Sequence, residues 1–353
     1  MSRRRHLPAR SQHRVSSLLA ITALWSVPTT AARADSSQTF KDWAVACDNT
    51  RHCEAVGFQA VDNDPAVSLW LSRDAGPATP VVAKLSVQLE GGGDVKAPLR
   101  LVAGKAAPIS VRDGQPIDGD TFARLLPALL DAETAQVTAG KERFVLSLSG
   151  LKAALLKMDD VQGRLGTPGA LLRKGARAES TVPPALPAPR LQAAAPVASR
   201  PGDAALLRTL LKKIAPDCGA GEGDTYKPSV DNTSLHRVSA TQVILVSQCQ
   251  DGYNAEDDVF VADDKPPYAV RAADFTQRGP NANGDEGAGL ANARFDGRTL
   301  TTMAKGRGIA DCGSMASWAW NGKAFALAEA SEEPLCRGFA AADVALRTFT
   351  TAR

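Results

Sequence analysis

The sequence lacks the motifs of the common hydrolases, nucleotide-binding enzymes and zinc proteins. It has no GxSxG, HExxH, P-loop or helix-opening GxGxxG motif, and no CxxC pair. Histidine is scarce, because after residue 34 only His52 and His236 occur. We expect His52 to face solvent in a tight loop and His236 to be an ordinary strand residue, since a triad or a zinc site needs further converging groups. We therefore expect no metal and no other cofactor, and we assign no catalytic residue.

Long apolar segments are missing beyond residue 27. The one marked apolar run, Val15–Val27, has 13 residues, whereas a bilayer-spanning helix needs about 20. An arginine-rich stretch without acidic residues precedes this run, and the small-residue sequence Ala32-Arg33-Ala34 follows it. These three parts in this order predict a secretory signal over residues 1–34, cleaved before Asp35. We expect the mature chain to have no membrane span.

Two export routes are open as alternatives. Residues 2–7 (SRRRHL) resemble a twin-arginine signal. Their arginines lie well ahead of the apolar run, however, and His6 stands where such signals usually have phenylalanine. We favour the general secretory route.

The excess of basic residues belongs to the predicted signal. The whole chain has 41 basic and 38 acidic residues. Residues 1–34 contain six arginines and no acid, so the mature chain has 35 basic and 38 acidic residues and a net charge of −3. Such a chain, without a basic cluster, is not expected to bind nucleic acid.

An even number of cysteines in an exported chain predicts disulfides. All six lie beyond the predicted signal: Cys47, Cys53, Cys218, Cys249, Cys312 and Cys336. The spacing favours bonds between neighbours (47–53, 218–249 and 312–336), although the other pairings stay open. Zinc is the competing explanation at Cys47, His52 and Cys53, but no fourth ligand accompanies them. Disulfides are the better interpretation.

The mature length suits two hydrophobic cores rather than one. Residues 176–203 carry six prolines, many alanines and no aromatic residue, a composition that predicts an extended, semi-rigid tether. We predict an N-terminal domain over residues 35–175, a linker over 176–203 and a disulfide-stapled C-terminal domain over 204–353.

Alternating apolar and polar residues predict strands in both halves. In the first half these are residues 40–47, 53–61, 67–73, 81–90, 99–103, 109–112, 134–138 and 143–147. Apolar residues at helical spacing predict helices over 120–131, 149–165 and 203–214, the first with Asp120 as its N-cap. The predicted fold class is α+β and β-rich: two antiparallel-sheet domains, sandwich or barrel-like, with a few helices, joined by the Pro/Ala-rich linker.

Two short loops predict hairpins in the second half. Asp296-Gly297 and Asn321-Gly322 each offer the two left-handed residues that a type I′ turn needs. We expect residues 291–295 to pair with 299–303, and 316–320 with 323–328.

The strongest candidate for a binding surface is the glycine-rich segment 306–313. It holds Arg307 and Asp311 beside a cysteine, and Trp318 and Trp320 follow on one face of a predicted strand. On a functional interpretation, these four residues form a patch for a glycan or a protein. On a structural interpretation, the tryptophans fill the core and Arg307 pairs with Asp311. The structural interpretation is favoured, because paired aromatic residues are common in sheets.

Four segments from both predicted domains carry a family resemblance. They are FKDWAVACDNTRHCEAVGF (40–58), CQDGYNAEDDVF (249–260), GRGIADCGSMASWAWNGKAF (306–325) and PLCRG (334–338). Together they resemble the exported bacterial proteins grouped as domain of unknown function 1176. The Trp43-x-Val45-x-Cys47 opening is also similar to the invasion-associated locus B family, over at most the first domain. The resemblance implies a periplasmic or surface location in a Gram-negative bacterium. It brings no established activity, so no catalytic residue is carried over.

The expected function is a non-enzymatic binding or interaction module of the cell envelope, with an envelope protein or a glycan as its partner. Stapled sheets, missing catalytic motifs and a near-neutral mature charge support this hypothesis. The alternative is an envelope hydrolase with a carboxylate-based site between the two domains, because paired carboxylates serve glycosidases. No two acidic residues are marked by the sequence as facing one another.

Overall fold

The structure is a computed structural model, and it describes residues 37–60, 65–89, 93, 95–214, 227–250, 252–277, 279 and 290–352. The predicted signal over residues 1–34 lies outside this part of the chain, and so does Cys218. Cys249 belongs to a strand, but its side chain is outside the description. No helix in the described ranges combines the length and the apolar character needed to cross a bilayer.

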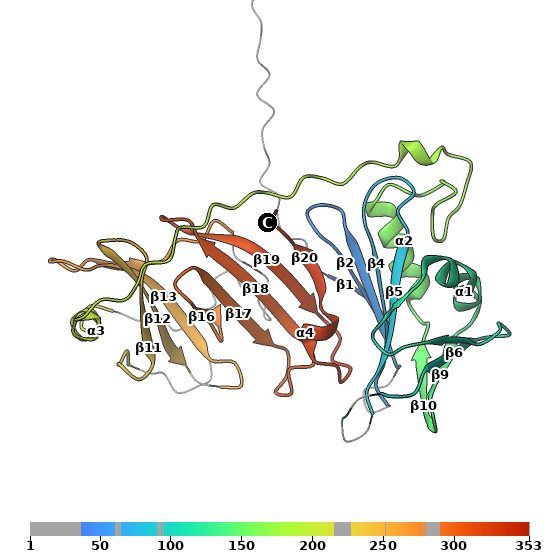
Figure 1. Cartoon of the computed structure of the whole chain (residues 1–353), viewed down its shortest axis with the longest axis horizontal. Coiled ribbons are helices and arrows are strands. Elements are labelled where there is room, and N and C mark those ends of the chain that lie inside the picture. Colours follow the sequence, from blue (N-terminus) through green and yellow to red (C-terminus); the bar gives the residue numbers. More distant parts are fainter. Residues whose placement is uncertain are drawn as a thin grey trace, which may run out of the picture. The chain divides into compact units, whose positions relative to one another are not determined.

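Antiparallel strands dominate the described chain and form four sheets (Figure 1). The first sheet has the order β1 (Gln38–Phe40), β2 (Trp43–Cys47), β3 (Cys53–Phe58), β4 (Val67–Arg73), β5 (Val81–Val87) and β8 (Pro116–Ile117). The second has the order β10 (Glu142–Ser147), β9 (Thr134–Ala139), β6 (Leu99–Ala103) and β7 (Ile109–Val111).

The other two sheets come from the second half of the sequence. The third has the order β11 (Thr233–Arg237), β12 (Gln242–Gln250), β13 (Glu256–Asp263) and β14 (Val270–Ala272), and β15 (Leu290–Ala291) also pairs with β13. The fourth has the order β16 (Arg294–Phe295), β17 (Thr299–Lys305), β18 (Gly313–Trp320), β19 (Phe325–Glu333) and β20 (Leu346–Phe349). The predicted β-rich α+β class, with antiparallel sheets and few helices, is confirmed.

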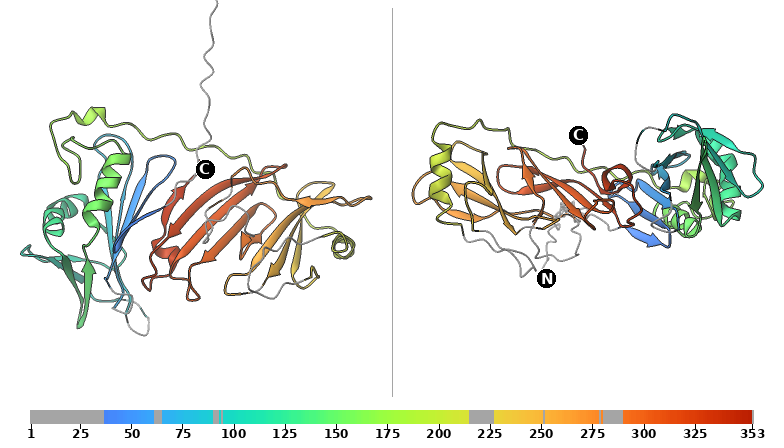
Figure 2. Two further views of the ribbon diagram at one scale, coloured as in Figure 1. Left: turned by 180° about the vertical axis from the view of Figure 1, so that it is seen from behind. Right: turned by 90° about the horizontal axis from the view of Figure 1, so that it is seen from below.

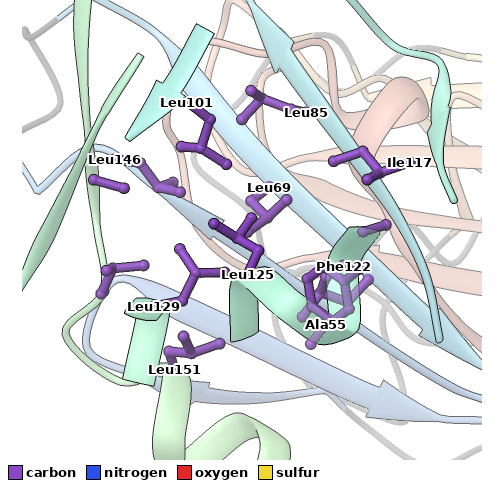
Figure 3. Packing of buried hydrophobic residues seen from close by; sticks show 14 of the residues in the cluster. Ala55, Leu69, Leu85, Leu101, Ile117, Phe122, Leu125, Leu129, Leu146 and Leu151 are labelled. Atoms are coloured by element: carbon purple, nitrogen blue, oxygen red, sulfur yellow. The ribbon is translucent and has the colours of Figure 1, made fainter. Parts of the chain in front are cut away.

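The first and second sheets share one apolar core, which two helices complete (Figure 3). Leu69 of the first sheet, Leu101 of the second and Leu125 of α1 (Gly119–Asp131) all point into it. Helix α2 (Leu151–Val161) adds its buried face to the same cluster. Alternate residues of these strands point into this core, and in β2, β3 and β4 the residues between them are largely buried as well.

The third sheet is covered on both faces. Along β12 the side chains alternate: Ile244 and Val246 pack against the fourth sheet, while Val243 and Leu245 pack against α3 (Asp203–Leu210). Figure 2 shows α3 beside the strands of this sheet. The period-two pattern of β12 therefore serves two different cores.

A further apolar cluster joins the two halves of the sequence. Ala44 and Phe58 of the first sheet contact Phe339 and Leu346, which flank α4 (Ala341–Val344). The Phe58 and Phe339 ring centroids are 6.0 Å apart. The division into two domains stays a prediction.

Helices α2 and α3 are shorter than the sequence predicts, and the predicted cap of α1 is wrong. Helix α1 is capped by Asp118, whose side chain accepts a hydrogen bond from Thr121 N at 2.9 Å, and not by Asp120. Asp118 has the extended backbone that an N-cap requires. The chain leaves α2 where Gly163 takes a positive φ of 67°. A short 3-10 turn, Glu179–Thr181, is the remaining helical element of the described chain.

Both predicted hairpins form, as β16–β17 and β18–β19, but their turns are not type I′. In each turn only the glycine has a positive φ. Instead, Asp296 Oδ1 accepts hydrogen bonds from the backbone N–H groups of Arg298 and Thr299, at 2.8 and 2.7 Å. Asn321 repeats this arrangement in the second turn. In both turns a side-chain oxygen of Asp or Asn accepts backbone hydrogen bonds, so the turn is held without a second left-handed residue.

The predicted linker, residues 176–203, is extended but hydrogen-bonded along its length. Leu186 N donates to Thr50 O at 3.1 Å, and Ala194 N donates to Trp320 O at 2.7 Å. The proline-rich segment therefore contacts both halves of the chain through its backbone.

Candidate functional site

One face of the fourth sheet lines a hollow that several elements build together. Strand register places Arg294, Thr301, Ser317 and Glu329 in one row, because each pairs with the next across β16, β17, β18 and β19. Residues directly opposite one another in a sheet share a face. This first row therefore presents two ionic ends and two central hydroxyl groups.

A second row lies beside the first on the same face. Met303, Met315, Ser331 and Arg347 pair in turn across β17, β18, β19 and β20. Lys305 follows Met303 two residues later and so belongs to the same face. The term "groove face" is used below for the residues of both rows together with Lys305: Arg294, Thr301, Met303, Lys305, Met315, Ser317, Glu329, Ser331 and Arg347.

The groove face forms the floor of a hollow of about 950 Å³, within the size range of small-ligand and peptide sites. Asn292 and Glu54 line it from outside the fourth sheet. None of the described residues that line it is aromatic. Met303 and Met315 lie directly opposite one another near its centre, and both are half-buried.

Two cations of the groove face have no ionic partner among the described residues. Arg294 is exposed and Lys305 is half-buried, and neither forms an ion pair within the described ranges. Arg347, at the opposite side, is held by Asp48. Unpaired positive charge is therefore concentrated on the β16–β17 side of the hollow.

Side chains from other segments bond both sides of the fourth sheet, along the part of β17 that extends beyond the short edge strand β16 and along β20. Along β17, Asn254 bonds both the N–H and the carbonyl of Lys305, each at 2.8 Å, and Asn292 Nδ2 donates to Met303 O at 2.7 Å. Along β20, Asn49 bonds both the N–H and the carbonyl of Thr350. Side chains thus take the hydrogen bonds that a further strand would make.

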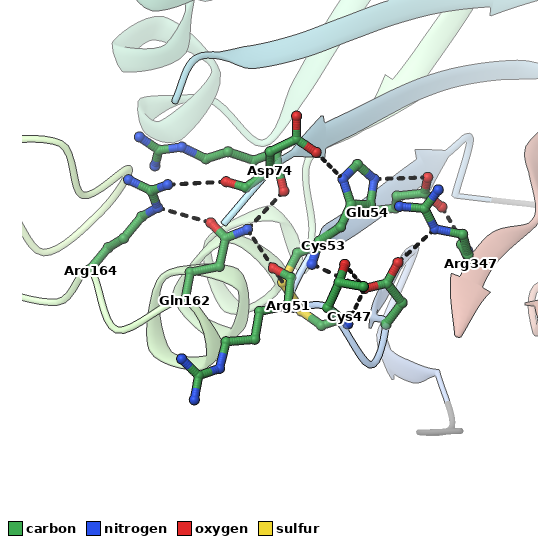
Figure 4. Close-up of a disulfide and its surroundings, with 12 residues drawn as sticks. Cys47, Arg51, Cys53, Glu54, Asp74, Gln162, Arg164 and Arg347 are labelled. Carbon is green, nitrogen blue, oxygen red and sulfur yellow. Dashed lines mark hydrogen bonds and ion pairs between the residues drawn. A yellow bond between two sulfur atoms is a disulfide. The ribbon is translucent and has the colours of Figure 1, made fainter. Parts of the chain in front are cut away.

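A cluster of charged residues closes the β20 side of the hollow (Figure 4). Glu54 Oε2 accepts a hydrogen bond from Arg347 N at 2.7 Å, and Asp48 Oδ2 accepts one from Arg347 Nε at 2.7 Å. The other carboxylate oxygen of Glu54 contacts His52 Nε2 at 3.2 Å. Asp48, in the turn between β2 and β3, and Glu54, on β3, hold Arg347 directly, and His52 contacts Glu54.

His52 lies between two carboxylates and does not simply face solvent. Its Nδ1 is 2.7 Å from Asp74 Oδ1, its Nε2 contacts Glu54, and its side chain is only 14 % exposed. Burial lowers the pKa of His52, but the hydrogen bonds from Glu54 and Asp74 outweigh burial, so the pKa is raised. The expectation of a solvent-facing loop histidine is wrong, because Asp74 comes from the end of another strand and covers the ring.

The remaining histidine behaves differently. His236 lies on β11, and its ring packs edge-on against Phe295 with centroids 5.3 Å apart. Burial lowers the pKa of His236, only partly opposed by Asp296. This is the ordinary strand histidine that the sequence predicts.

Of the four predicted binding residues, Arg307 and Asp311 lie together, away from the groove face. Arg307 Nε donates to Asp311 Oδ1 at 2.7 Å, and a second Arg307 nitrogen bonds Asp311 Oδ2. Asp311 is buried and also accepts from Gly338 N at 2.8 Å. Burial raises the pKa of Asp311, but the bonds from Arg307 and Gly338 dominate and lower it. This geometry matches the ion pair of the structural interpretation.

Trp318 and Trp320 lie in the core between the third and fourth sheets. Each is 1 % exposed. Trp318 Nε1 donates to Gln277 O at 2.9 Å, and its ring packs edge-on against Phe275. Trp320 packs against Phe325 with centroids 5.1 Å apart. Neither indole reaches the surface, as the structural interpretation expects. A ligand role for the two tryptophans stays an untested prediction.

Two disulfides of the favoured pairing are present. Cys47 bonds Cys53 across the β2–β3 hairpin, and Cys312 bonds Cys336. The pairing of Cys218 with Cys249 lies outside the described residues. Asp311 lies close to the second disulfide, but bonded sulfurs are not the thiolates that a metal needs. This group therefore offers no metal site.

The sequence does not single out the residues of the groove face. Thr301, Met303 and Lys305 alternate in TLTTMAK, which predicts a strand with one exposed face but not which strands lie beside it. Asp74 and Arg347 are far from His52 in the sequence, so no local spacing brings them together. The weak available signal was the alternation of hydroxyl, methionine and charged residues on neighbouring predicted strands.

Comparison with known proteins decides the family. The model of the family described as Protein of unknown function (DUF1176) matches residues 37–352, which is nearly all of the described chain. The chain belongs to this family. The predicted resemblance is thereby confirmed over both halves of the sequence.

One curated protein is similar to this DUF1176 member over most of the chain, and one solved structure is similar over about a third of it. The Uncharacterized protein YpfG of Escherichia coli (strain K12) is 32 % identical over 344 residues, covering 90 % of this chain and 92 % of that protein. Invasion associated protein b from Bartonella henselae, a crystal structure, is 19 % identical with a TM-score of 0.27, covering 36 % of this chain and 99 % of that one.

Proposed function

We propose that this DUF1176 protein is exported, loses residues 1–34 and works in the periplasm or outside the cell as a non-enzymatic binding module of the envelope. Residues 35–175 and 204–353 would act as two domains joined by the linker over residues 176–203. The two disulfides of the described chain support export, because such bonds persist in oxidising compartments.

The ligand site of this proposal is the groove face. The observation that carries it is a hollow of about 950 Å³. Its floor holds the Met303–Met315 pair together with two cations that have no ionic partner among the described residues. Methionine is unbranched and polarizable, and it is enriched with arginine at binding surfaces. The side-chain bonds along β17 and β20 fix the walls, so the site is formed before a ligand arrives.

Binding is favoured over hydrolysis by the state of the carboxylates on the β20 side of the hollow. Glu54 accepts from Arg347 N and contacts His52, while Asp48 accepts from Thr50, His52 and Arg347. A general acid or base needs a free position from which to reach a substrate proton. These carboxylates instead hold the end of the fourth sheet.

Export is tested by the N-terminus of the protein in its own cells. Intact-mass analysis of protein from the periplasmic or culture fraction of the Gram-negative host should find Asp35 as the first residue and the cysteines oxidised. A cytoplasmic protein that retains Met1 would overturn the export proposal.

Binding is tested by selection from a displayed random 12-residue peptide library on immobilised residues 35–353. Selected peptides should bind the wild-type protein and lose affinity for Met315→Lys, which places a charge in the centre of the groove face. The matched control is Val145→Lys, at an exposed position of β10. Peptides or muropeptides that bind both variants equally would move the site elsewhere, and turnover of peptidoglycan or ester substrates would favour the hydrolase.

A further inference from the structure

We propose that the groove face recognises an acidic protein segment with apolar side chains at its centre, laid across the strands of the fourth sheet. This inference rests on the proposed function and names the ligand class of the same site. Its carboxylates would face Arg294 and Lys305, and its apolar side chains would lie on Met303 and Met315.

The mode of binding follows from the edges of the sheet. A peptide often binds a sheet by adding a strand to a free edge. Here the β17 edge is bonded by Asn254 and Asn292, and the β20 edge by Asn49 and Glu54. With these positions on β17 and β20 occupied, the open surface left for a segment is the face of the sheet, where side chains rather than backbone groups recognise it.

The sign of the ligand follows from the charges that lack partners. Arg294 and Lys305 project from neighbouring strands and form no ion pair among the described residues. Four residue steps along β17 separate Lys305 from Thr301, the partner of Arg294, which corresponds to about 13 Å. This separation runs along the strands, so neighbouring acidic side chains at one end of a segment that crosses the strands would have to diverge to reach the two cations. Complementary charge at the rim steers association and fixes orientation.

The apolar centre of the ligand follows from the floor. Met303 and Met315 are directly opposite one another, with hydroxyl groups of Thr301, Ser317 and Ser331 around them. Adaptable methionine side chains accept leucine, isoleucine or methionine side chains of varied shape. The five strands span about 19 Å, the length of about six extended residues.

Other occupants fit the same face less well. Sugar rings are commonly held by stacking on aromatic side chains, and the hollow has no aromatic lining. A nucleic acid carries a negative charge at every phosphate and would also lie against Glu54 and Glu329, whereas the proposed segment has its carboxylates only at the end near Arg294 and Lys305. An acyl chain would lie across hydroxyl rows as well as across the methionines. An acidic, apolar-centred peptide is the ligand that uses both features of the floor.

Defined peptides test the inference by fluorescence anisotropy with residues 35–353. The probe is a labelled eight-residue peptide with two glutamates at one end, two leucines at the centre and serine elsewhere. One matched peptide carries lysines in place of the glutamates, and another carries serines in place of the leucines. The acidic, leucine-centred peptide should bind at least about tenfold more tightly than either control, and its affinity should fall with salt.

Charge-reversal variants locate the contact. Arg294→Glu combined with Lys305→Glu should lower the affinity for the acidic probe at least about tenfold and raise the affinity for the lysine peptide. Arg298→Glu combined with Lys323→Glu is the matched control, since this pair makes the same charge change on two exposed turns outside the hollow and should leave affinity unchanged. A preference of the wild-type protein for the lysine peptide, or equal binding of all three, would overturn the inference.

The two proposals fail in different ways. If library-selected peptides lose affinity with Met315→Lys but are basic or uncharged, the groove face stands as the site and the acidic ligand class is wrong. If selected peptides ignore Met315→Lys altogether, the site itself is wrong.

Discussion

The backbone N–H of Arg347 donates a hydrogen bond to the carboxylate of Glu54 at 2.7 Å. The two residues are 293 positions apart in the sequence, so this contact joins the β2–β3 hairpin to β20, the last strand of the described chain. It also gives the hollow over the fourth sheet its closed end, because both residues line that hollow.

Removing the Glu54 carboxylate is expected to destabilise the fold. Glu54→Ala leaves Arg347 N without an acceptor in a site where Glu54 is only 8 % exposed. Losing a hydrogen bond to a charged group costs about 2 kcal/mol. Urea unfolding should show this loss in the free energy of unfolding. The exposed Glu142→Ala is the matched control, and equal stability of both variants would contradict a structural role for Glu54.

The clamp around His52 predicts a pH dependence with a definite sign. The folded protein raises the pKa of His52 above 6.5, so it holds the proton where the unfolded chain begins to lose it. This stabilisation is complete below pH 6.5 and is lost as pH rises through the folded-state pKa. The difference in unfolding free energy between wild type and His52→Gln should therefore shrink from pH 6 to higher pH.

His236 provides the opposite sign within the same molecule. Its pKa is lowered by burial, so the folded state resists protonation and stability is lost as pH falls below 6.5. His236→Gln should remove this acid-side loss. Parallel pH profiles for both histidine variants would contradict the assignment of His52 to a carboxylate clamp.

Glu333 predicts a third titration, beside the Cys312–Cys336 disulfide. Burial raises the pKa of Glu333 to about 8, from 4.5. The folded state thus keeps a proton that the unfolded chain releases, and stability falls as pH rises from 4.5 to about 8. Glu333→Gln keeps an acceptor for Leu335 N and should be more stable than wild type at pH 8, by several kcal/mol at most.

The advantage of Glu333→Gln should vanish near pH 4.5, where the wild-type carboxyl is protonated in both states. Asp343→Asn, at an exposed position of α4, serves as the control. A stability difference that stays constant from pH 4.5 to 8 would show that Glu333 is ionised in the folded protein.

The two disulfides are expected to contribute unequally to the free energy of unfolding. The Cys47–Cys53 bond closes a short loop and the Cys312–Cys336 bond a longer one, with sequence separations of 6 and 24. Chain entropy gives about 2 kcal/mol for the first and about 3.5 kcal/mol for the second. Urea unfolding of the two double Cys→Ser variants should rank in this order, and the reverse order would show that native-state packing dominates.

Local patterns predicted much of the fold. Period-two alternation indicated the strands of the first half, and helical spacing indicated α1, α2 and α3. The position of the turn at Asp296 was predicted correctly, but its type I′ conformation was not. The Asp296 side chain holds the turn by accepting two backbone hydrogen bonds, and no second left-handed residue is needed. The cap of α1 was missed by two residues for a similar reason, since Asp118 and Asp120 carry the same local signal.

The groove face was not predictable in the same way. It depends on the order of five strands, which puts Met303 opposite Met315, and on Arg347 returning to a hairpin near the start of the described chain. No short-range spacing contains that information. Arg307 and Asp311 were noticed because they are close in sequence, and the structure forms their ion pair away from the hollow.

Methionine methyl resonances test the central claim, that ligands bind the groove face, most directly. Beyond the predicted signal the chain has three methionines: Met303 and Met315 lie in the hollow, and Met158 is fully buried in the first core. In protein labelled at the methionine methyl carbons, a library-selected peptide should shift the Met303 and Met315 resonances together and saturably, while Met158 stays unchanged. Saturated binding that leaves both groove resonances in place would contradict the account.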